Sequence, residues 1–406
     1  MKSGLEWPNP GKLARLCAVL PADQSFPALL KPVQHRLAPL QEVILRDSIY
    51  APDSGYHVEQ VEIVFSQDFP PEKIAAAWMA TVAATEALRI TFEFTHGIPA
   101  GFRFVTEIPV MTFAHAVPDS WELWLESDRC RSLLFPDRAP WRIVHWPLQR
   151  RLIWTFHHAL LDGRSISRIL HSFLNCLAEE SAPELRLSTW FPPSLESIDH
   201  AARIFRDMSA STIPRGNSAS PGPAVICLGS HLLEALQSLA AKKLTTAPTL
   251  ITWAWGQAVA GLTDSGEVIV EQIRAGMPQP GTAGFTMNLL PLRIVRSGLS
   301  ELPDFHAQLL SLRQIESVSC DDFPCGVYPD TDALGASTLM VEHATLKHSV
   351  GDFDFLESLI LHERRADTTL ATAYLLPDLR LEVEGADRHE LLAAWIAVLK
   401  HGISQA

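Results

Sequence analysis

The chain has 406 residues, 47% of them hydrophobic, and its 46 acidic and 33 basic residues give a formal net charge of −13. This length and composition support a large core divided into two or three lobes. The acidic balance, without any basic run, argues against nucleic acid and against anionic membrane surfaces as partners.

Two further features of the sequence favour a cytoplasmic protein. The six cysteines form no CxxC pair, which indicates reduced thiols and no metal site. The N-terminus lacks a sustained apolar region, and the longest apolar stretch, residues 250–262, is too short to span a bilayer. We therefore expect neither a signal peptide nor a membrane span.

The first part of the chain alternates between strand and helix patterns. Residues 1–30 are rich in proline, and we expect them to form an irregular N-terminal extension. Alternating apolar residues predict a strand over residues 57–65. Pro70 and Pro71 then begin a helix, because proline is tolerated in the first helical turn, and another helix is expected from Ser120.

A strand, a loop and a helix follow in the middle of the chain. Residues 151–156 form the predicted strand, and Ser165 is the expected N-cap of the helix. Residues 209–224 are rich in Ser, Pro and Gly and are the best linker candidate. We therefore expect a mixed α/β (α+β) protein with an N-terminal lobe over residues 31–208 and a C-terminal lobe over residues 225–406. Further helices or strands are predicted at residues 231–243, 249–262, 268–273, 379–383 and 388–399.

The most informative stretch is HHALLDGRS, residues 157–165, in the loop between that strand and helix. A histidine at the end of a strand can project into a cleft, and its neutral ring accepts a proton near neutral pH, so His158 is a candidate general base. Gly163 would permit a tight turn and a close approach of substrate, and its N–H is a candidate oxyanion donor. Asp162 is better placed to anchor the loop through an arginine. A histidine pair alone is more typical of a surface loop or of a hydrogen-bonded core residue.

The complete pattern HHxxxDGxS resembles the signature of the condensation domains of nonribosomal peptide synthetases, in the superfamily that shares the chloramphenicol acetyltransferase fold. Flanking segments support the resemblance in order and spacing. Residues 37–60 are similar to the first conserved block through Gln41, residues 86–92 to a block written HEALRTxF, and residues 284–294 to a late block with an Asn-x-x-Pro-x-Arg core. The block rich in Tyr and Trp that usually follows the catalytic motif is not recognisable in residues 185–210.

The resemblance implies two chloramphenicol acetyltransferase-like lobes in a V-shaped pseudo-dimer, with a central tunnel that admits donor and acceptor from opposite faces. It implies that His158 is the catalytic histidine and that His157 has a more structural role. Ser165 and Asn288 would line the tunnel, although an ordinary turn cap is the alternative for Asn288.

The resemblance also implies an ion pair that holds the catalytic loop. Asp162 would pair with an arginine, for which Arg89 is the first candidate and Arg293 the alternative. Removing one partner of such a buried pair costs about 3–5 kcal/mol, so we expect Asp162→Ala to damage chiefly folding or loop geometry.

The function that the resemblance implies is that of a freestanding condensation enzyme. It would transfer an acyl or aminoacyl group from the phosphopantetheine of an acyl or peptidyl carrier protein, supplied in trans, to an amine or hydroxyl of a small-molecule acceptor. The alternatives are an acyltransferase that uses acyl-coenzyme A and a non-catalytic module that docks a carrier protein. We expect a monomer without a bound cofactor or metal. Whether His158 removes a proton or positions the acceptor stays open.

Overall fold

The structure is a computed structural model that describes most of the chain after residue 35. The described residues are 36–105, 107–188, 190–206, 208, 222–276, 279–318, 322, 337–363, 369–385 and 387–405. The expected extension over residues 1–30 and most of the expected linker lie outside them.

The first lobe is built on a five-stranded sheet in the order β13-β1-β6-β5-β4. Its core lies between this sheet and helices α3 and α5, and it is centred on Trp78. The Trp78 ring meets Trp141, Trp154 and Phe173 edge to face at centroid distances of 5.1–5.6 Å, which is the favoured aromatic geometry. The elements of this lobe are α2 (Pro39–Tyr50), β1 (Val58–Phe65), α3 (Pro71–Ala84), β2 (Ile90–Thr95), β3 (Ile98–Phe104), β4 (Thr112–Phe113), α4 (Trp121–Arg129), β5 (Trp141–Trp146), β6 (Arg151–His157), α5 (Gly163–Leu177), β7 (Arg186–Leu187) and β13 (Leu356–His362).

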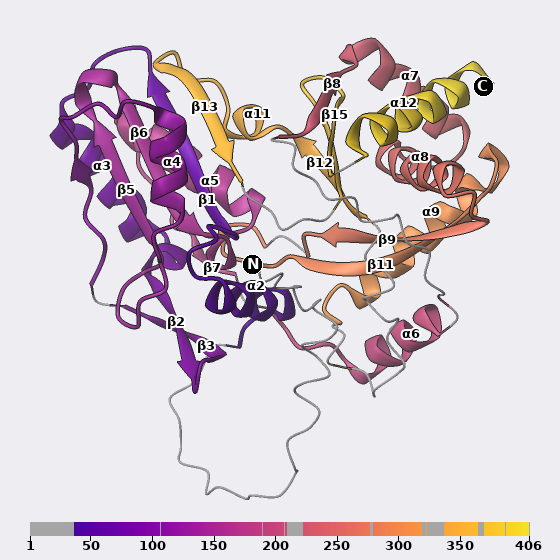
Figure 1. Cartoon of the computed structure of the whole chain (residues 1–406), viewed down its shortest axis with the longest axis horizontal. Helices are drawn as coiled ribbons and strands as arrows, with labels where there is room; N and C mark the ends of the chain where they lie inside the picture. Colours follow the sequence, from indigo (N-terminus) through magenta and orange to yellow (C-terminus); the bar gives the residue numbers. More distant parts are fainter. Residues whose placement is uncertain are drawn as a thin grey trace, which may run out of the picture.

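The second lobe is built on a six-stranded sheet in the order β11-β9-β12-β14-β15-β8 (Figure 1). Helices α8 and α12 pack on it and on each other, with Trp255 and Trp395 in edge-to-face contact at 5.0 Å. The elements of this lobe are α6 (Leu195–Phe205), β8 (Ala224–Cys227), α7 (Gly229–Lys242), α8 (Ala247–Leu262), β9 (Glu267–Arg274), β11 (Asn288–Val295), α9 (Leu302–Ser311), β12 (Thr338–Ala344), β14 (Leu370–Leu376), β15 (Arg380–Glu384) and α12 (Arg388–Ser404). Two elements from the same half of the sequence, β10 (Thr282–Ala283) and α11 (Leu346–Val350), pack in the first lobe instead.

The two lobes exchange segments, which the sequence did not reveal. Strand β13 follows β12 in the chain but pairs antiparallel with β1, so a C-terminal segment forms the edge of the first sheet. Strand β10 pairs in parallel with β7, and Phe285 and Met287 enter the first core. Helix α6 instead packs against the second core through Ala201 and Phe205. The expected division at the linker therefore does not separate the two sheets.

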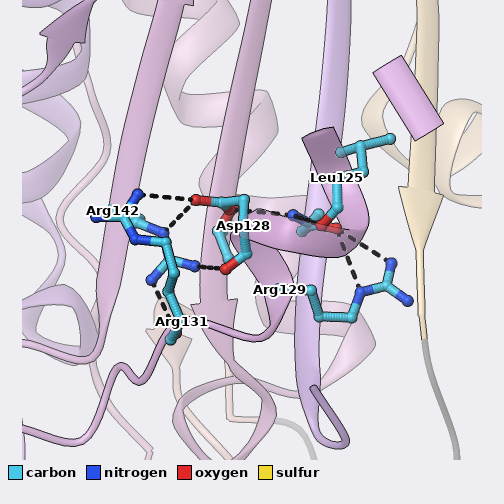
Figure 2. A network of polar contacts seen from close by, with 7 residues as sticks. Leu125, Asp128, Arg129, Arg131 and Arg142 are labelled. Carbon is cyan, nitrogen blue, oxygen red and sulfur yellow. Dashed lines mark hydrogen bonds and ion pairs between the residues drawn. The ribbon is translucent and has the colours of Figure 1, made fainter. Parts of the chain in front are cut away.

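A buried polar network fixes α4 against the opposite face of the first sheet (Figure 2). Asp128 is 3% exposed, and its carboxylate accepts hydrogen bonds from Gln60 of β1, Arg142 of β5 and Thr155 of β6 at 2.7–3.1 Å. A buried carboxylate needs such donors, because charge removed from water is otherwise strongly unfavourable. The network thus ties together three adjacent strands, two of which carry side chains of the site described below.

Most of the predicted elements are confirmed. Strand β1 buries Val61, Ile63 and Phe65 as the alternation required, and α3 begins at Pro71. One helix start was wrong. The N-cap of α5 is Asp162, whose carboxylate accepts the Ser165 N–H, because Ser165 already lies inside the first turn.

Candidate active site

The HHxxxDG segment lies where strand β6 ends and helix α5 begins. His157 is the last residue of β6, and a short 3-10 turn, His158–Leu160, carries the chain to α5. The His158 N–H donates to the carbonyl of His57 at 2.7 Å, and Gln41 of α2 donates to the carbonyl of Ala159 at 2.8 Å. These bonds hold the backbone of the loop, so the side chain directions in the motif are well defined.

His158 faces a carboxylate of β1 and an aromatic ring of the segment between β10 and β11. Its Nδ1 is 2.7 Å from Oε1 of Glu59 on β1, and its ring meets Phe285 edge to face at 5.6 Å. Phe285 belongs to the segment between β10 and β11 that enters the first core. The His158 side chain is 20% exposed and that of Glu59 only 5%. The imidazole is therefore held on one side by a buried carboxylate and stays partly accessible.

His157 is buried and has different partners. Its Nδ1 accepts the Ala159 N–H at 3.2 Å, and its Nε2 lies 2.9 Å from the hydroxyl of Ser48 on α2. Burial holds the pKa of His157 well below its ordinary value, and the neighbouring His57 and His158 lower it further. A ring that is neutral and bonded at both nitrogens has the structural role that the resemblance implied for His157.

The expected ion pair of Asp162 with an arginine is wrong. Asp162 is 4% exposed; Oδ1 accepts the Ser165 N–H at 2.9 Å, and Oδ2 accepts the backbone N–H and the hydroxyl of Thr286 at 3.2 and 2.9 Å. Its own N–H donates to the carbonyl of Gly284 at 3.0 Å. The physical reason is that a helix N-terminus and the second-lobe segment already supply donors to both carboxylate oxygens.

Among the described residues, neither candidate arginine forms an ion pair with Asp162. Arg293 pairs with Glu267 across the antiparallel pair β9 and β11. Arg89 follows α3 in a 3-10 turn, and its Nε is buried without a hydrogen-bond partner among the described residues. Asp162 is therefore held by neutral donors, the N–H of Ser165 and the N–H and hydroxyl of Thr286.

The hydrogen bonds of Ser165 and Asn288 do not support the expectation that these side chains line a passage. The Ser165 hydroxyl bonds both the carbonyl and the N–H of Gly284 at 2.9 Å. The Asn288 amide donates to the carbonyls of Glu316 and Val318, as a structural cap would.

Gly163 begins α5 without a positive φ, and a Cβ there would meet no atom within 4 Å. The turn before α5 therefore does not use the left-handed conformation that glycine allows, and the open space beside Gly163 fits a close approach of substrate.

Sequence reasoning missed Glu59 and Thr286. Glu59 shares a face of β1 with Val61, Ile63 and Phe65, and a carboxylate on an otherwise apolar face was the signal that could have identified it. Thr286 lies within the block GFTMN, but nothing in its spacing indicated that it reaches Asp162, because the contact joins residues 124 positions apart.

Other features of the described part of the chain lie apart from this site. A cavity of about 440 Å³ beside the C-terminal end of α4 is lined by Arg131, Arg138 and Arg142 among others, and by no residue of the HHxxxDG segment. The described residues contain no group of three metal-ligating side chains, and none of their helices has the length and apolarity to cross a bilayer. Cys130, Cys176 and Cys227 are free thiols.

Comparisons with known proteins show a shared fold and distant sequence similarity. No protein-family model matches the chain. Two of the large proteins that make up the linear gramicidin synthase of Brevibacillus parabrevis are similar to it, one 24% identical over 320 residues and the other 25% identical over 353 residues. The matches cover 67% and 76% of this chain but only 4% and 7% of those large proteins.

Solved structures resemble the chain over almost its full length. The condensation domain of the monacolin K polyketide synthase MokA is 14% identical with a TM-score of 0.70, covering 92% of this chain and 98% of that one. The epimerization domain TycB3(E) of tyrocidine synthetase B is 15% identical with a TM-score of 0.69, covering 95% and 99%. A starter condensation domain of rhizomide synthetase in complex with C8-CoA and Leu-SNAC is 15% identical with a TM-score of 0.66, covering 91% and 94%. The chain therefore has the fold of the condensation domains of nonribosomal peptide synthetases, as the HHxxxDG segment indicated.

Proposed function

We propose that the chain catalyses acyl transfer from a carrier-bound thioester to an amine, forming an amide bond. The observation that carries this proposal is the position of His158, just after β6, between the buried carboxylate of Glu59 and Phe285 of the segment between β10 and β11. A partly exposed imidazole at the junction of two lobes is what a reaction between two separately delivered substrates requires. The V-shaped arrangement with a tunnel to this ring is part of the proposal.

The chemistry needs one basic nitrogen. The amine nitrogen attacks the thioester carbonyl carbon, the C–S bond breaks, the amine loses one proton, and the sulfur leaves as a thiol after taking up a proton. His158 accepts the proton of the amine, or orients the amine and stabilises its developing positive charge. Its Nε2 is the reacting nitrogen, because Nδ1 faces Glu59. The Gly163 N–H, at the start of α5, is the candidate donor to the thioester oxygen.

The donor is proposed to be an acyl or aminoacyl group on the phosphopantetheine of a carrier protein. The similarity to synthetase proteins supports this choice, because the matched segments belong to peptide synthetases. Coenzyme A is the second candidate carrier of the same acyl group, since a neighbour of the same fold is described in complex with C8-CoA. In both cases the reacting bond and the role of His158 are the same.

Epimerisation is the other reaction that a specific observation favours, because the TycB3 epimerization domain covers 95% of this chain. That reaction removes and returns the α-proton of a carrier-bound aminoacyl group and needs no acceptor amine. Glu59 argues against it, because a carboxylate that contacts Nδ1 of His158 is not placed as a second, opposing acid.

The test is a product assay on an isolated carrier protein loaded with one aminoacyl group. The chain is mixed with the loaded carrier and a panel of amines, and intact-mass spectrometry follows loss of the thioester and appearance of an amide. A parallel reaction uses the same acyl group on coenzyme A, and a third omits the amine and is run in D₂O. Amide formation from the carrier supports the proposal. Turnover with coenzyme A alone, or deuterium uptake without amide, would overturn it.

A further inference from the structure

We propose that Glu59 is a positioning residue for His158, fixing its tautomer and orientation during acyl transfer. The inference rests on the proposed function of His158 as the reacting histidine. It starts from one contact, 2.7 Å between Oε1 of Glu59 and Nδ1 of His158, which is the distance of an ion pair without the alignment of a hydrogen bond.

The burial of Glu59 points to a role that depends on His158. The residue is 4% exposed, and its second oxygen, Oε2, is buried without a hydrogen-bond partner among the described residues. A carboxylate removed from water is unfavourable unless it is paired, and the described partner of this one is His158. The pairing therefore favours a proton on Nδ1 in the resting enzyme and stabilises the imidazolium that forms when Nε2 accepts another proton.

The two histidines of the motif consequently have opposite tautomers. In His157, Nδ1 accepts the Ala159 N–H, so the proton of the neutral ring lies on Nε2 and points to Ser48. In His158, the negative charge of Glu59 beside Nδ1 favours a proton on that nitrogen, so we infer that the lone pair lies on Nε2. The lone pair of His157 is thus bonded to the Ala159 N–H, whereas the inferred lone pair of His158 lies on the nitrogen that does not contact Glu59.

The other carboxylates near the motif are engaged elsewhere. Asp47 of α2 pairs with His57 at 3.1 Å, and Asp162 accepts hydrogen bonds from Ser165 and Thr286. Asp162, the acid within the motif, is therefore a structural cap, and Glu59 supplies the carboxylate for His158 from a strand about one hundred residues earlier in the chain.

Glu59→Gln is the informative variant, because it keeps the shape and removes the charge. An amide can also turn its NH₂ toward Nδ1, which would impose the wrong tautomer on His158. We expect kcat for amide formation to fall about 100-fold or more, with little change in KM, by analogy with loss of a histidine-orienting carboxylate in hydrolytic triads.

Glu62→Gln is the matched control. Glu62 is also on β1, is 6% exposed and pairs with Arg151 and His362 on the opposite face. Its substitution removes a comparable buried charge without touching His158. We expect Glu62→Gln to reduce stability but to retain wild-type kcat. Equal losses of kcat in the two variants would show that Glu59 acts only through stability and would overturn the inference.

A second measurement does not depend on turnover. The ¹⁵N shifts of selectively labelled histidine, with the His158 signals assigned by their loss in His158→Ala, report which ring nitrogen carries the proton. We expect Nδ1–H in the wild type and a shift of the tautomer in Glu59→Gln. An Nε2–H ring in the wild type would overturn the inference, even if the acyl-transfer assay succeeds. Failure of the acyl-transfer assay alone would instead refute the proposed function and leave this assignment standing.

Discussion

Replacing Asp162 by alanine is expected to destabilise the contact between the lobes by about 2–4 kcal/mol. The change removes the N-cap of α5, which contributes about 1 kcal/mol. It also leaves the Thr286 N–H, now bonded to Oδ2 at 3.2 Å, without its acceptor, at about 1–3 kcal/mol. Thr286→Val keeps the backbone N–H and removes the hydroxyl, which lies within hydrogen-bond distance of Oδ2 and of the Ala275 carbonyl, and should cost about 1 kcal/mol.

Urea unfolding followed by tryptophan fluorescence measures these differences, and Ser120→Ala is the control. Ser120 caps α4 through a single bond to the Leu123 N–H, at an exposed position within one lobe. It should therefore show the loss of a cap alone, about 1 kcal/mol. If Asp162→Ala were no more destabilising than Ser120→Ala, the hydrogen bonds of Asp162 to the second lobe would contribute nothing, and the reasoning would be refuted.

Three further predictions concern the protonation of buried histidines and the room around two glycines. Burial lowers the pKa of His145 to about 4 and holds that of His157 well below its ordinary value, so the unfolded chain binds more protons as pH falls through 6.5. The free energy of unfolding should be greatest above pH 6.5 and should fall below it by up to about 1.4 kcal/mol per histidine per pH unit. Urea midpoints that do not change from pH 7.5 to 5.5 would contradict this. Gly163→Ala should fold with wild-type stability, since a Cβ meets nothing within 4 Å, yet raise KM for the acyl donor; an unchanged KM would mean that substrate does not use that space. Gly256→Ala should cost about 1–3 kcal/mol, because its Cβ would lie 2.4–2.7 Å from three atoms of Ile294; the double variant with Ile294→Ala should lose less than the sum of the two single changes, and additivity in thermal unfolding would count against the clash.

Much of the fold was predictable because local patterns determine local elements. The alternation Val61, Ile63, Phe65 places one face of β1 in the core, and Pro71 can begin α3 without an unsatisfied N–H. The exchange of β13 into the first sheet was not predictable in this way, because its pairing with β1 joins residues about three hundred positions apart.

The site was predictable only where the motif itself carries the chemistry. The strand, loop and helix around His157 and His158 follow from the sequence pattern. The partner of Asp162 could not be predicted from that pattern, because Thr286 lies 124 positions away in the chain and approaches only in the folded protein. Glu59 was overlooked because a single acidic residue in a strand does not indicate a function until the side chain that it contacts, here His158, is known from the structure.

The central claim is that the His158 ring performs acyl transfer at the junction of the lobes. Single-turnover amide formation from a loaded carrier protein tests it most directly when His158→Ala is compared with His231→Ala. The His231 side chain is 99% exposed on α7, so its loss controls for removal of a histidine elsewhere. We expect His231→Ala to retain the wild-type rate and His158→Ala to be about 10²–10⁴-fold slower with unchanged folding. A folded His158→Ala variant that forms the amide at the wild-type rate would contradict the claim.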